Sequence, residues 1–339
     1  MRISGENQMR FVDLFCGVGG FRQALEPLGH RCVFSSDIDK DACQSYELNY
    51  KERPHGDIVE IPAYDVPKHD VLCAGFPCQP FSISGNQDGF EDARGTLLYE
   101  ILRIAEFHQP AVLFLENVKN YRSHAGGKTL EETLRLLRKA NYHVHYKILN
   151  ASDFGVPQKR ERIYFICFRK DLGVQEFSFP SSIEKKISLE NILLHEDDPR
   201  LSALNLWVER SDLTLKPKLP KEGDNRPLRI GTVGKGGQGE RVYSVKGHAI
   251  TLSAFGGGIG AKTGMYLIND KIRRLHPIEC RRLMGFPENF QLHPRPNVCF
   301  KQFGNSVVVP VVSHIFKAVE AHLVGTKLSS LIPLSTKPA

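Results

Sequence analysis

Residues 11–21 read FVDLFCGVGGF, an apolar run that passes through a glycine-rich turn into a helical pattern. Phe11–Phe15 has the composition of a buried strand. The helix that follows carries an apolar face of Phe21, Ala24, Leu25 and Leu28. Glycines at such a turn let backbone N–H groups approach a ligand at the helix N-terminus. The stretch therefore predicts an open α/β sheet with a nucleotide site at its carboxyl edge, and an ordinary tight turn is the alternative.

Alternating strands and helices continue to about residue 170. We expect further strands at Arg31–Ser36, Asp70–Ala74, Ala111–Leu115, Tyr142–Leu149 and Arg162–Phe168. Leucine-rich stretches at helical spacing, residues 97–105 and 130–137, lie between them. This alternation predicts a doubly wound, mostly parallel sheet with helices on both faces.

The pattern changes near residue 180. From there to about 275 the chain has few helical patterns and many Gly, Pro and Lys residues, which predicts a smaller domain of short strands and long loops. A short helix at Ile278–Met284 and an apolar helix at Ser306–Val319 follow. We therefore divide the chain into a first domain (1–189), a second domain (190–275), a hinge (276–300) and a C-terminal segment (301–339) that returns to the first domain.

The composition is that of a globular protein, with 41% hydrophobic and 24% charged residues in a chain of 339. No run is long enough for a membrane span, and the polar N-terminus does not resemble a signal peptide, so we expect a cytoplasmic protein. The 8 cysteines form no Cys-x-x-Cys pair, so we expect free thiols and no metal site.

Basic residues are concentrated in one part of the chain. Residues 200–282 contain 16 Lys and Arg against 7 Asp and Glu, whereas the whole chain has a net charge of +7. A basic excess confined to one segment is typical of a protein that binds a polyphosphate, and a solvated surface is the alternative.

Residues with chemical potential follow the predicted strands. Cys78 lies between Pro77 and Pro80, which stiffen its loop, and its thiolate would be the reactive form. Glu116 ends one predicted strand, where an acid can donate a proton. Gln158–Arg162 precedes another and offers two guanidinium groups. Each residue also has a purely structural interpretation: a buried cysteine in a turn, a helix cap, or a run of surface charge. Their shared position at strand ends nevertheless favours an active site.

Two acids could hold a nucleoside. Asp37 ends the second predicted strand, where a carboxylate can accept both hydroxyls of a ribose, and Asp57 could accept a hydrogen bond from an adenine amine. The glycine spacing of Asp13–Phe21 differs from Gly-x-Gly-x-x-Gly, so a dinucleotide held by its pyrophosphate fits poorly.

Taken in order, these motifs resemble those of the DNA cytosine-C5 methyltransferase family. The resemblance covers about Arg10 to Val319 through Asp13–Phe21, Gly75–Ser82, Glu116–Val118, Gln158–Ile163, Arg274–Pro287 and Gln302–Val308. It implies an enzyme that swings a cytosine out of duplex DNA and methylates it with S-adenosylmethionine.

The resemblance also implies roles for single residues. Cys78 would add to C6 of the ring, Glu116 would supply a proton at N3, and Arg162, with help from Arg160, would hold O2. Ile38 departs from the pattern of one similar family member, in which a tryptophan stacks on the adenine. The implied cofactor contacts are Phe15, Val18, Gly20, Asp37, Ile38, Asp57, Pro77, Leu97, Asn305 and Ser306.

The second domain would recognise the target site. Gln238 would fill the gap left by the flipped base, and Arg241 and the Ser253–Gly258 loop, with Phe255 and Gly257, would reach bases or phosphates. Ser84 lies in a loop that would close over the DNA. Similarity through the variable segment implies the site GCGC, modified at its inner cytosine, a monomeric enzyme, and a restriction endonuclease as partner.

Three other functions compete with this interpretation. Relatives with the same motifs act on transfer RNA, but they lack a long glycine-rich region for target recognition. A nicotinamide-dependent oxidoreductase would leave Cys78 and Glu116 without roles. A non-catalytic DNA-binding protein would not need the combination of nucleophile, acid and cofactor loop.

Overall fold

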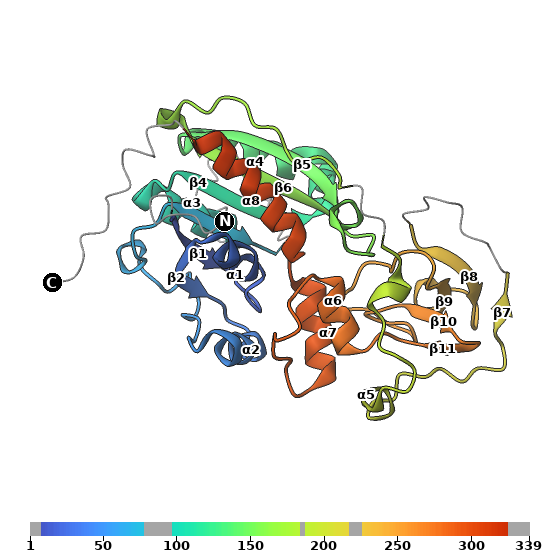
Figure 1. The fold of residues 1–339 in the computed structure, drawn as a ribbon. Coiled ribbons are helices and arrows are strands. Elements are labelled where there is room, and N and C mark those ends of the chain that lie inside the picture. The colour runs from blue at the N-terminus through green and yellow to red at the C-terminus, as the bar shows by residue number, and fades with distance from the viewer. Residues whose placement is uncertain (1–7, 78–96, 184–186, 217–225, 325–339) are drawn as a thin grey trace.

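The computed structural model describes residues 8–77, 97–183, 187–216 and 226–324, which form two β-sheets connected by helices (Figure 1). The first sheet has the strand order β2-β1-β3-β4-β6-β5. Its strands are β1 (Arg10–Leu14), β2 (Arg31–Ser36), β3 (Val71–Gly75), β4 (Val112–Val118), β5 (Tyr142–Asn150) and β6 (Glu161–Arg169).

The first four strands in this order are parallel, and only β6 runs against its neighbours, β4 and β5. The predicted mostly parallel sheet is therefore confirmed. The reversal of β6 brings its first residues to the edge at which β1, β3 and β4 end, so functional residues at the start of β6 join those at the strand ends.

Helices cover both faces of this sheet, as predicted. Helices α1 (Gly20–Leu25) and α8 (Val309–Leu323) pack on the face that carries Phe11 and Phe114. Helices α3 (Leu97–His108) and α4 (Lys128–Lys139) pack on the opposite face, with Val12 and Leu113. Neighbouring residues of one strand thus enter different cores, as the alternation of a pleated strand requires.

Several predicted boundaries were wrong. The helix expected at Ser306–Val319 is α8, which begins at Val309, with Pro310 in its first turn; a separate helix, α7 (Pro296–Asn305), ends just before Ser306. Strand β1 stops at Leu14 because Phe15 takes a positive φ of 55°. Strand β4 continues to Val118 because its last residues pair with the start of β6.

The second sheet is built from short strands, as predicted. Its order is β11-β10-β9-β8-β7, and it forms the lobe on the right of Figure 1. The strands are β7 (Thr214–Leu215), β8 (Leu228–Thr232), β9 (Arg241–Ser244), β10 (Met265–Ile268) and β11 (Lys271–Arg273). A single-turn helix, α5 (Pro199–Ser202), precedes it, and α6 (Pro277–Leu283) and α7 lead back to the first sheet.

One described stretch, residues 296–323, is long and apolar enough to be compared with a membrane-crossing helix. It consists of α7 and α8, which are interrupted at residues 306–308. Helix α8 buries Val312, Ile315 and Phe316 in the core beside the first sheet, so we interpret the stretch as two core helices.

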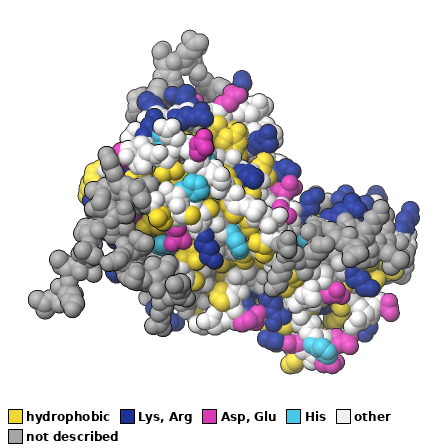
Figure 2. Space-filling model, turned by 45° about the horizontal axis from the view of Figure 1, so that its top comes forward, with side chains coloured by type: hydrophobic (Ala, Val, Ile, Leu, Met, Phe, Trp, Pro, Cys, Tyr) yellow, Lys and Arg dark blue, Asp and Glu magenta, His cyan; other side chains and the backbone are white. Residues whose placement is uncertain are grey.

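Lys and Arg side chains lie along the lobe of the second sheet (Figure 2). The exposed basic residues of this region include Lys216, Arg226, Arg229, Lys235 and Lys246. Part of the basic excess of the sequence therefore lies on an exposed surface of the second lobe.

Candidate active site

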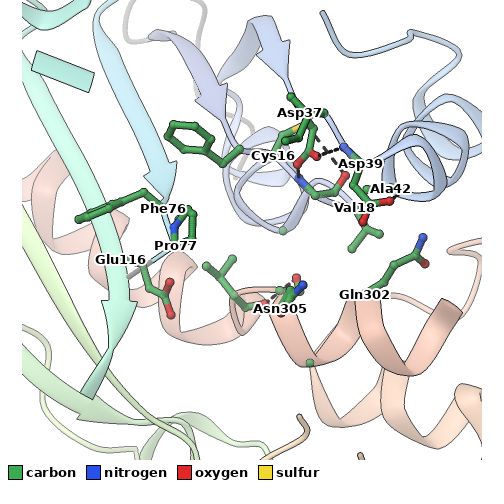
Figure 3. Close-up of a pocket in the computed structure, with 18 of the residues that line it drawn as sticks. Cys16, Val18, Asp37, Asp39, Ala42, Phe76, Pro77, Glu116, Gln302 and Asn305 are labelled. Carbon is green, nitrogen blue, oxygen red and sulfur yellow. Dashed lines mark hydrogen bonds between the residues drawn. The ribbon is translucent and has the colours of Figure 1, made fainter. Parts of the chain in front are cut away.

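A cavity of about 570 Å³ lies at the edge where the parallel strands end. Its wall combines the turns after β1, β2 and β3, the end of β4, and one side of α7 (Figure 3). All ten residues expected to contact a cofactor line it: Phe15, Val18, Gly20, Asp37, Ile38, Asp57, Pro77, Leu97, Asn305 and Ser306. The cavity is also lined by Glu116, Arg160, Arg162 and Phe255.

The glycine turn after β1 needs its glycines. Gly19 has a φ of 80°, and a Cβ there would lie 2.5 Å from the hydroxyl of Tyr50. A Cβ on Gly20 would lie 2.6 Å from Cγ2 of Val307. The backbone of the turn therefore packs closely against α2 (Lys40–Tyr50) and the segment before α8. Because these glycines have no side chains, the turn backbone itself lines the cavity.

Asp37 is tied to the turn from the neighbouring strand end. Its Oδ2 accepts a hydrogen bond from the Gly17 N–H at 2.7 Å, and its Oδ1 accepts one from the Asp39 N–H at 2.8 Å. Burial raises the pKa of Asp37, and these two backbone bonds oppose the shift. Each oxygen retains a further lone pair, so the carboxylate can still accept a hydroxyl from a ligand.

Ile38 follows Asp37 and is 71% exposed although it is a large apolar residue. It lines the cavity together with Val59, another exposed apolar side chain. The two aliphatic groups can cover a flat, weakly polar ring.

Glu116 and Arg162 form an ion pair in the cavity wall. Oε1 of Glu116 lies 3.2 Å from Nε of Arg162, and both side chains are largely buried. Burial raises the pKa of Glu116, while the charges of Arg162 and Arg160 lower it. A carboxyl group with a raised pKa inside a cavity can act as a proton donor.

Arg160 lies in the same wall but is used differently. Its guanidinium donates to three backbone carbonyls, those of Leu252 (2.9 Å), Gly304 (2.9 Å) and Ser306 (2.8 Å). Its Nε is buried with no hydrogen-bond partner among the described residues. Burial lowers the pKa of Arg160 to about 9.

Two predicted site residues, Cys78 and Ser84, lie outside the described residues. Pro77, which directly precedes Cys78 in the chain, lines the cavity.

Three predicted DNA contacts, Gln238, Phe255 and Gly257, lie in two glycine-rich loops that touch each other. Gln238 is exposed in a 3-10 turn, and Arg241 begins β9. Nε of Arg241 is buried without a hydrogen-bond partner within the described ranges. A Cβ on Gly239 would lie 2.5 Å from the carbonyl oxygen of Gly257, so the backbones of the two loops are in direct contact.

Helix α7 contributes a face to the cavity, and Asn305 is the one residue of this face that was predicted as a cofactor contact. Val298, Lys301, Gln302 and Asn305 all line the cavity, and Nζ of Lys301 lies 2.6 Å from Oδ2 of Asp39 on the opposite wall. Their spacing of three, four and seven residues is that of one helix face and could have identified them. Among the residues that the structure describes, no group of three or more His, Cys, Asp or Glu side chains could hold a metal ion.

The sequence is similar to known proteins over nearly its whole length. A sequence model of the family described as C-5 cytosine-specific DNA methylase matches residues 9–321. The type II methyltransferase M.HhaI of Haemophilus parahaemolyticus is 50% identical over 321 residues, 95% of each chain. The type II methyltransferase M.HpaII of Haemophilus parainfluenzae is 38% identical over 320 residues, 91% of this chain and 88% of that protein.

Solved structures share the fold at lower sequence identity. The S. pombe Dnmt2 methyltransferase superimposes with a TM-score of 0.71 at 22% identity, over 94% of this chain and 100% of its own. The Entamoeba histolytica methyltransferase EhMeth superimposes with a TM-score of 0.67 at 17% identity, over 94% of this chain and 99% of its own.

Proposed function

Because this chain belongs to the C-5 cytosine-specific DNA methylase family, we propose that it methylates the inner cytosine of GCGC in duplex DNA through a transient bond to Cys78. It is a DNA cytosine-C5 methyltransferase, and its methyl donor is S-adenosylmethionine. The observation that carries the proposal for its catalytic centre is the buried pair of Glu116 and Arg162 in the cavity wall.

The cavity fits this cofactor. The bare backbone at Gly20 lets the chain approach it closely, and Asp37 has lone pairs left for ribose hydroxyls. Ile38 would cover one face of the adenine, and Asp57 would accept a hydrogen bond from its amine. The remaining proposed contacts are Phe15, Val18, Pro77, Leu97, Asn305 and Ser306. When bound, S-adenosylmethionine supplies an electrophilic methyl group on a positively charged sulfur.

The chain's own residues would make the cytosine reactive. C5 of cytosine is a poor nucleophile until the ring loses its aromaticity. The thiolate of Cys78 would form a bond to C6, and the electron pair of the C5–C6 double bond would move toward C5 as Glu116 gives a proton to N3. Arg162 would hold O2 and keep the ring in place. After methylation, loss of the C5 proton and departure of the thiolate would restore the double bond.

The electrostatics of the pair support this division of roles. Burial raises the pKa of Glu116, which favours the protonated form that can donate to N3. Arg162 opposes the shift, so the acid can also give the proton up. Nη1 of Arg162 donates to the carbonyl of Glu161, so part of its guanidinium is held in place while the rest faces the cavity.

We propose that the second lobe recognises the DNA. Residues 190–275 would form the target-recognition domain beside a catalytic domain (1–189), with 276–300 as hinge and 301–339 returning to the catalytic domain. Gln238 would fill the gap left by the flipped base. Arg241, whose Nε has no hydrogen-bond partner in the part of the chain that the structure describes, would contact bases or phosphates, as would Phe255 and Gly257, which are both exposed. Ser84 would approach the DNA from the closing loop.

The similarity to type II methyltransferases supports three further proposals. The enzyme would work as a monomer, it would act in the cytoplasm, and a restriction endonuclease for the same site would accompany it.

A mechanism-based trap tests the proposed function. A GCGC duplex with 5-fluorocytosine at the inner position should become cross-linked to the enzyme in the presence of S-adenosylmethionine, because fluorine blocks the final elimination. Cys78→Ala should bind the duplex without cross-linking. Cys167→Ala, at a buried core position in β6, should still cross-link. Failure of the wild-type enzyme to cross-link would contradict the role of Cys78, and methylation of RNA but not of duplex DNA would favour an RNA substrate.

A further inference from the structure

We propose that Arg160 is a positioning residue that couples target recognition to the cofactor cavity. It would do so by fastening residues 249–254, called the recognition segment below, to residues 304–306 of the cavity wall. The inference rests on the proposed function, because it takes the recognition segment to be part of the DNA-reading lobe.

The hydrogen bonds of Arg160 define the coupling. Its side chain is 2% exposed, and Nη1 donates to the carbonyl of Leu252 at 2.9 Å. Nη2 donates to the carbonyls of Gly304 at 2.9 Å and Ser306 at 2.8 Å. Gly304 and Ser306 line the cavity. One guanidinium therefore bridges the recognition segment and the wall that would contact the cofactor.

The recognition segment is held from a second side. The Ala249 N–H donates to the carbonyl of Pro157 at 2.7 Å, and the Lys159 N–H donates to the carbonyl of Ala249 at 2.9 Å. Oε1 of Gln158 accepts the Leu252 N–H at 3.1 Å. Both backbone groups of Leu252 are thus bound by side chains of one short stretch, residues 158–160, which leads into β6.

The backbones of the two coupled segments are also in direct contact. A Cβ on Gly304 would lie 2.2 Å from the backbone nitrogen of Ala254, so no side chain separates them. Phe255, the next residue, is 74% exposed and lines the cavity. A shift of the recognition segment would therefore displace both the wall at Gly304 and the aromatic ring at the cavity.

The buried charge of Arg160 raises the free energy needed to separate the two segments. The buried guanidinium is held by carbonyl oxygens of the two segments, and no carboxylate among the described residues forms an ion pair with it. Separating the segments would leave buried donors without acceptors. The two segments are thus expected to move together when DNA binds, which makes the cofactor site sensitive to the DNA sequence.

Arg162 is the more suitable group for the cytosine itself. It pairs with Glu116 and lines the cavity, whereas both terminal nitrogens of Arg160 are bound to backbone. Substitutions of the two arginines should therefore have different effects. A change at Arg162 should affect the rate of methyl transfer, and a change at Arg160 should affect the coupling between DNA binding and cofactor binding.

Binding of S-adenosylhomocysteine, measured by calorimetry with and without a GCGC duplex, tests this. The ratio of the two dissociation constants measures the coupling. Arg160→Lys keeps the charge but cannot reach three carbonyls, so the ratio should fall at least fivefold, as should the preference for GCGC over a site with one changed base pair. Arg162→Lys, the matched control, should lower kcat and leave the ratio unchanged.

A second variant changes a residue that does not line the cavity. Gln158 is buried and binds Leu252 but does not line the cavity, so Gln158→Met should lower the coupling ratio in the same direction. It also carries the test if Arg160→Lys does not fold. If either folded variant loses kcat but keeps the wild-type ratio, the proposal is wrong. A wild-type enzyme that does not methylate GCGC duplexes would contradict the proposed function instead.

Discussion

Nε of Arg162 lies 3.2 Å from Oε1 of Glu116, and the two residues come from neighbouring strands that run in opposite directions. In this register Val118, at the end of β4, is opposite Arg162, at the start of β6. The reversal of one strand thus places a guanidinium beside an acid at the edge where the parallel strands end. A fully parallel sheet would have placed the start of β6 at the far edge.

Glu116→Gln should nearly abolish methyl transfer. Glutamine has the same shape and can still hydrogen-bond the cytosine, but it cannot give a proton to N3, so kcat should fall about 10²- to 10⁴-fold. DNA affinity should stay close to that of the wild type in a gel-shift assay. Glu161→Gln, which removes an exposed partner of Lys119 at 3.0 Å, is the control and should keep its kcat. A Glu116→Gln enzyme with a kcat within threefold of wild type would exclude proton donation by Glu116.

The pH dependence of the reaction should report on the same pair. Since burial raises the pKa of Glu116 and the protonated form donates, the rate should decline as pH increases through this raised pKa. Arg162→Gln removes the largest opposing charge, so the alkaline limb of the pH profile of kcat/KM should move to higher pH, although the rate is lower throughout. Arg162→Lys keeps the charge and should leave the limb in place. Movement of the limb to lower pH in Arg162→Gln would contradict this assignment.

Much of the first sheet could be predicted because each element is encoded locally. Strand β2 has the predicted bounds, Arg31–Ser36, since a short apolar run between turn residues is a strong signal. The predicted cofactor contacts meet in one cavity because most of them follow strand ends, and parallel strands end at the same edge.

Other features depend on contacts that a local pattern does not contain. Helix α2 was not predicted, because its sequence KDACQSYELNY is mostly polar and lacks a clear apolar face. The different uses of Arg160 and Arg162 were not predicted either. Arg160 lies before β6, outside the alternation of the strand, and its partners Leu252 and Gly304 are distant in sequence.

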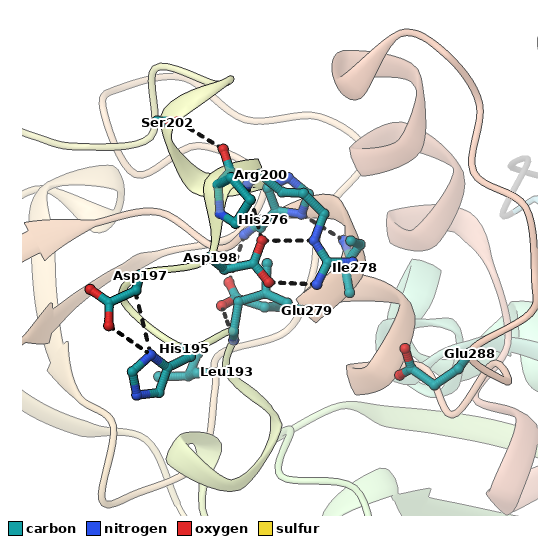
Figure 4. Close-up of polar contacts among 12 residues, drawn as sticks. Leu193, His195, Asp197, Asp198, Arg200, Ser202, His276, Ile278, Glu279 and Glu288 are labelled. Atoms are coloured by element: carbon teal, nitrogen blue, oxygen red, sulfur yellow. Dashed lines mark hydrogen bonds and ion pairs between the residues drawn. The ribbon is translucent and has the colours of Figure 1, made fainter.

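Glu279 should be essential for the stability of the second lobe. Its carboxylate lies at the start of α6 beside His276 (Figure 4) and pairs with Arg273 of β11 at 2.7 Å, with the two side chains 0% and 1% exposed. It also accepts the Leu194 N–H at 2.9 Å and the His276 N–H at 2.7 Å. Glu279→Gln leaves a buried guanidinium facing an amide donor, so it should lower the free energy of unfolding by about 3–5 kcal/mol.

Denaturant unfolding measures this loss. Glu132→Gln, in an exposed pair with Arg135 on α4, is the control and should change stability by no more than about 1 kcal/mol. Equal effects of the two substitutions would mean that the buried pair does not hold β11 to α6.

Ile38→Trp should strengthen cofactor binding. Ile38 is 71% exposed, lines the cavity and directly follows Asp37, so in the proposed binding mode it lies against the adenine. An indole would add a stacking surface, and stacking of a base on an aromatic side chain contributes about 1–3 kcal/mol. Because isoleucine already supplies some contact, we expect a gain in binding free energy near the lower limit, which corresponds to a decrease of about fivefold in the dissociation constant of S-adenosylmethionine.

Calorimetry measures the change in this dissociation constant, and Ile38→Leu, which adds no ring, should bind as the wild type does. If Ile38→Trp binds no more tightly than Ile38→Leu, the adenine does not pack on this side chain, and the orientation proposed for the cofactor is wrong.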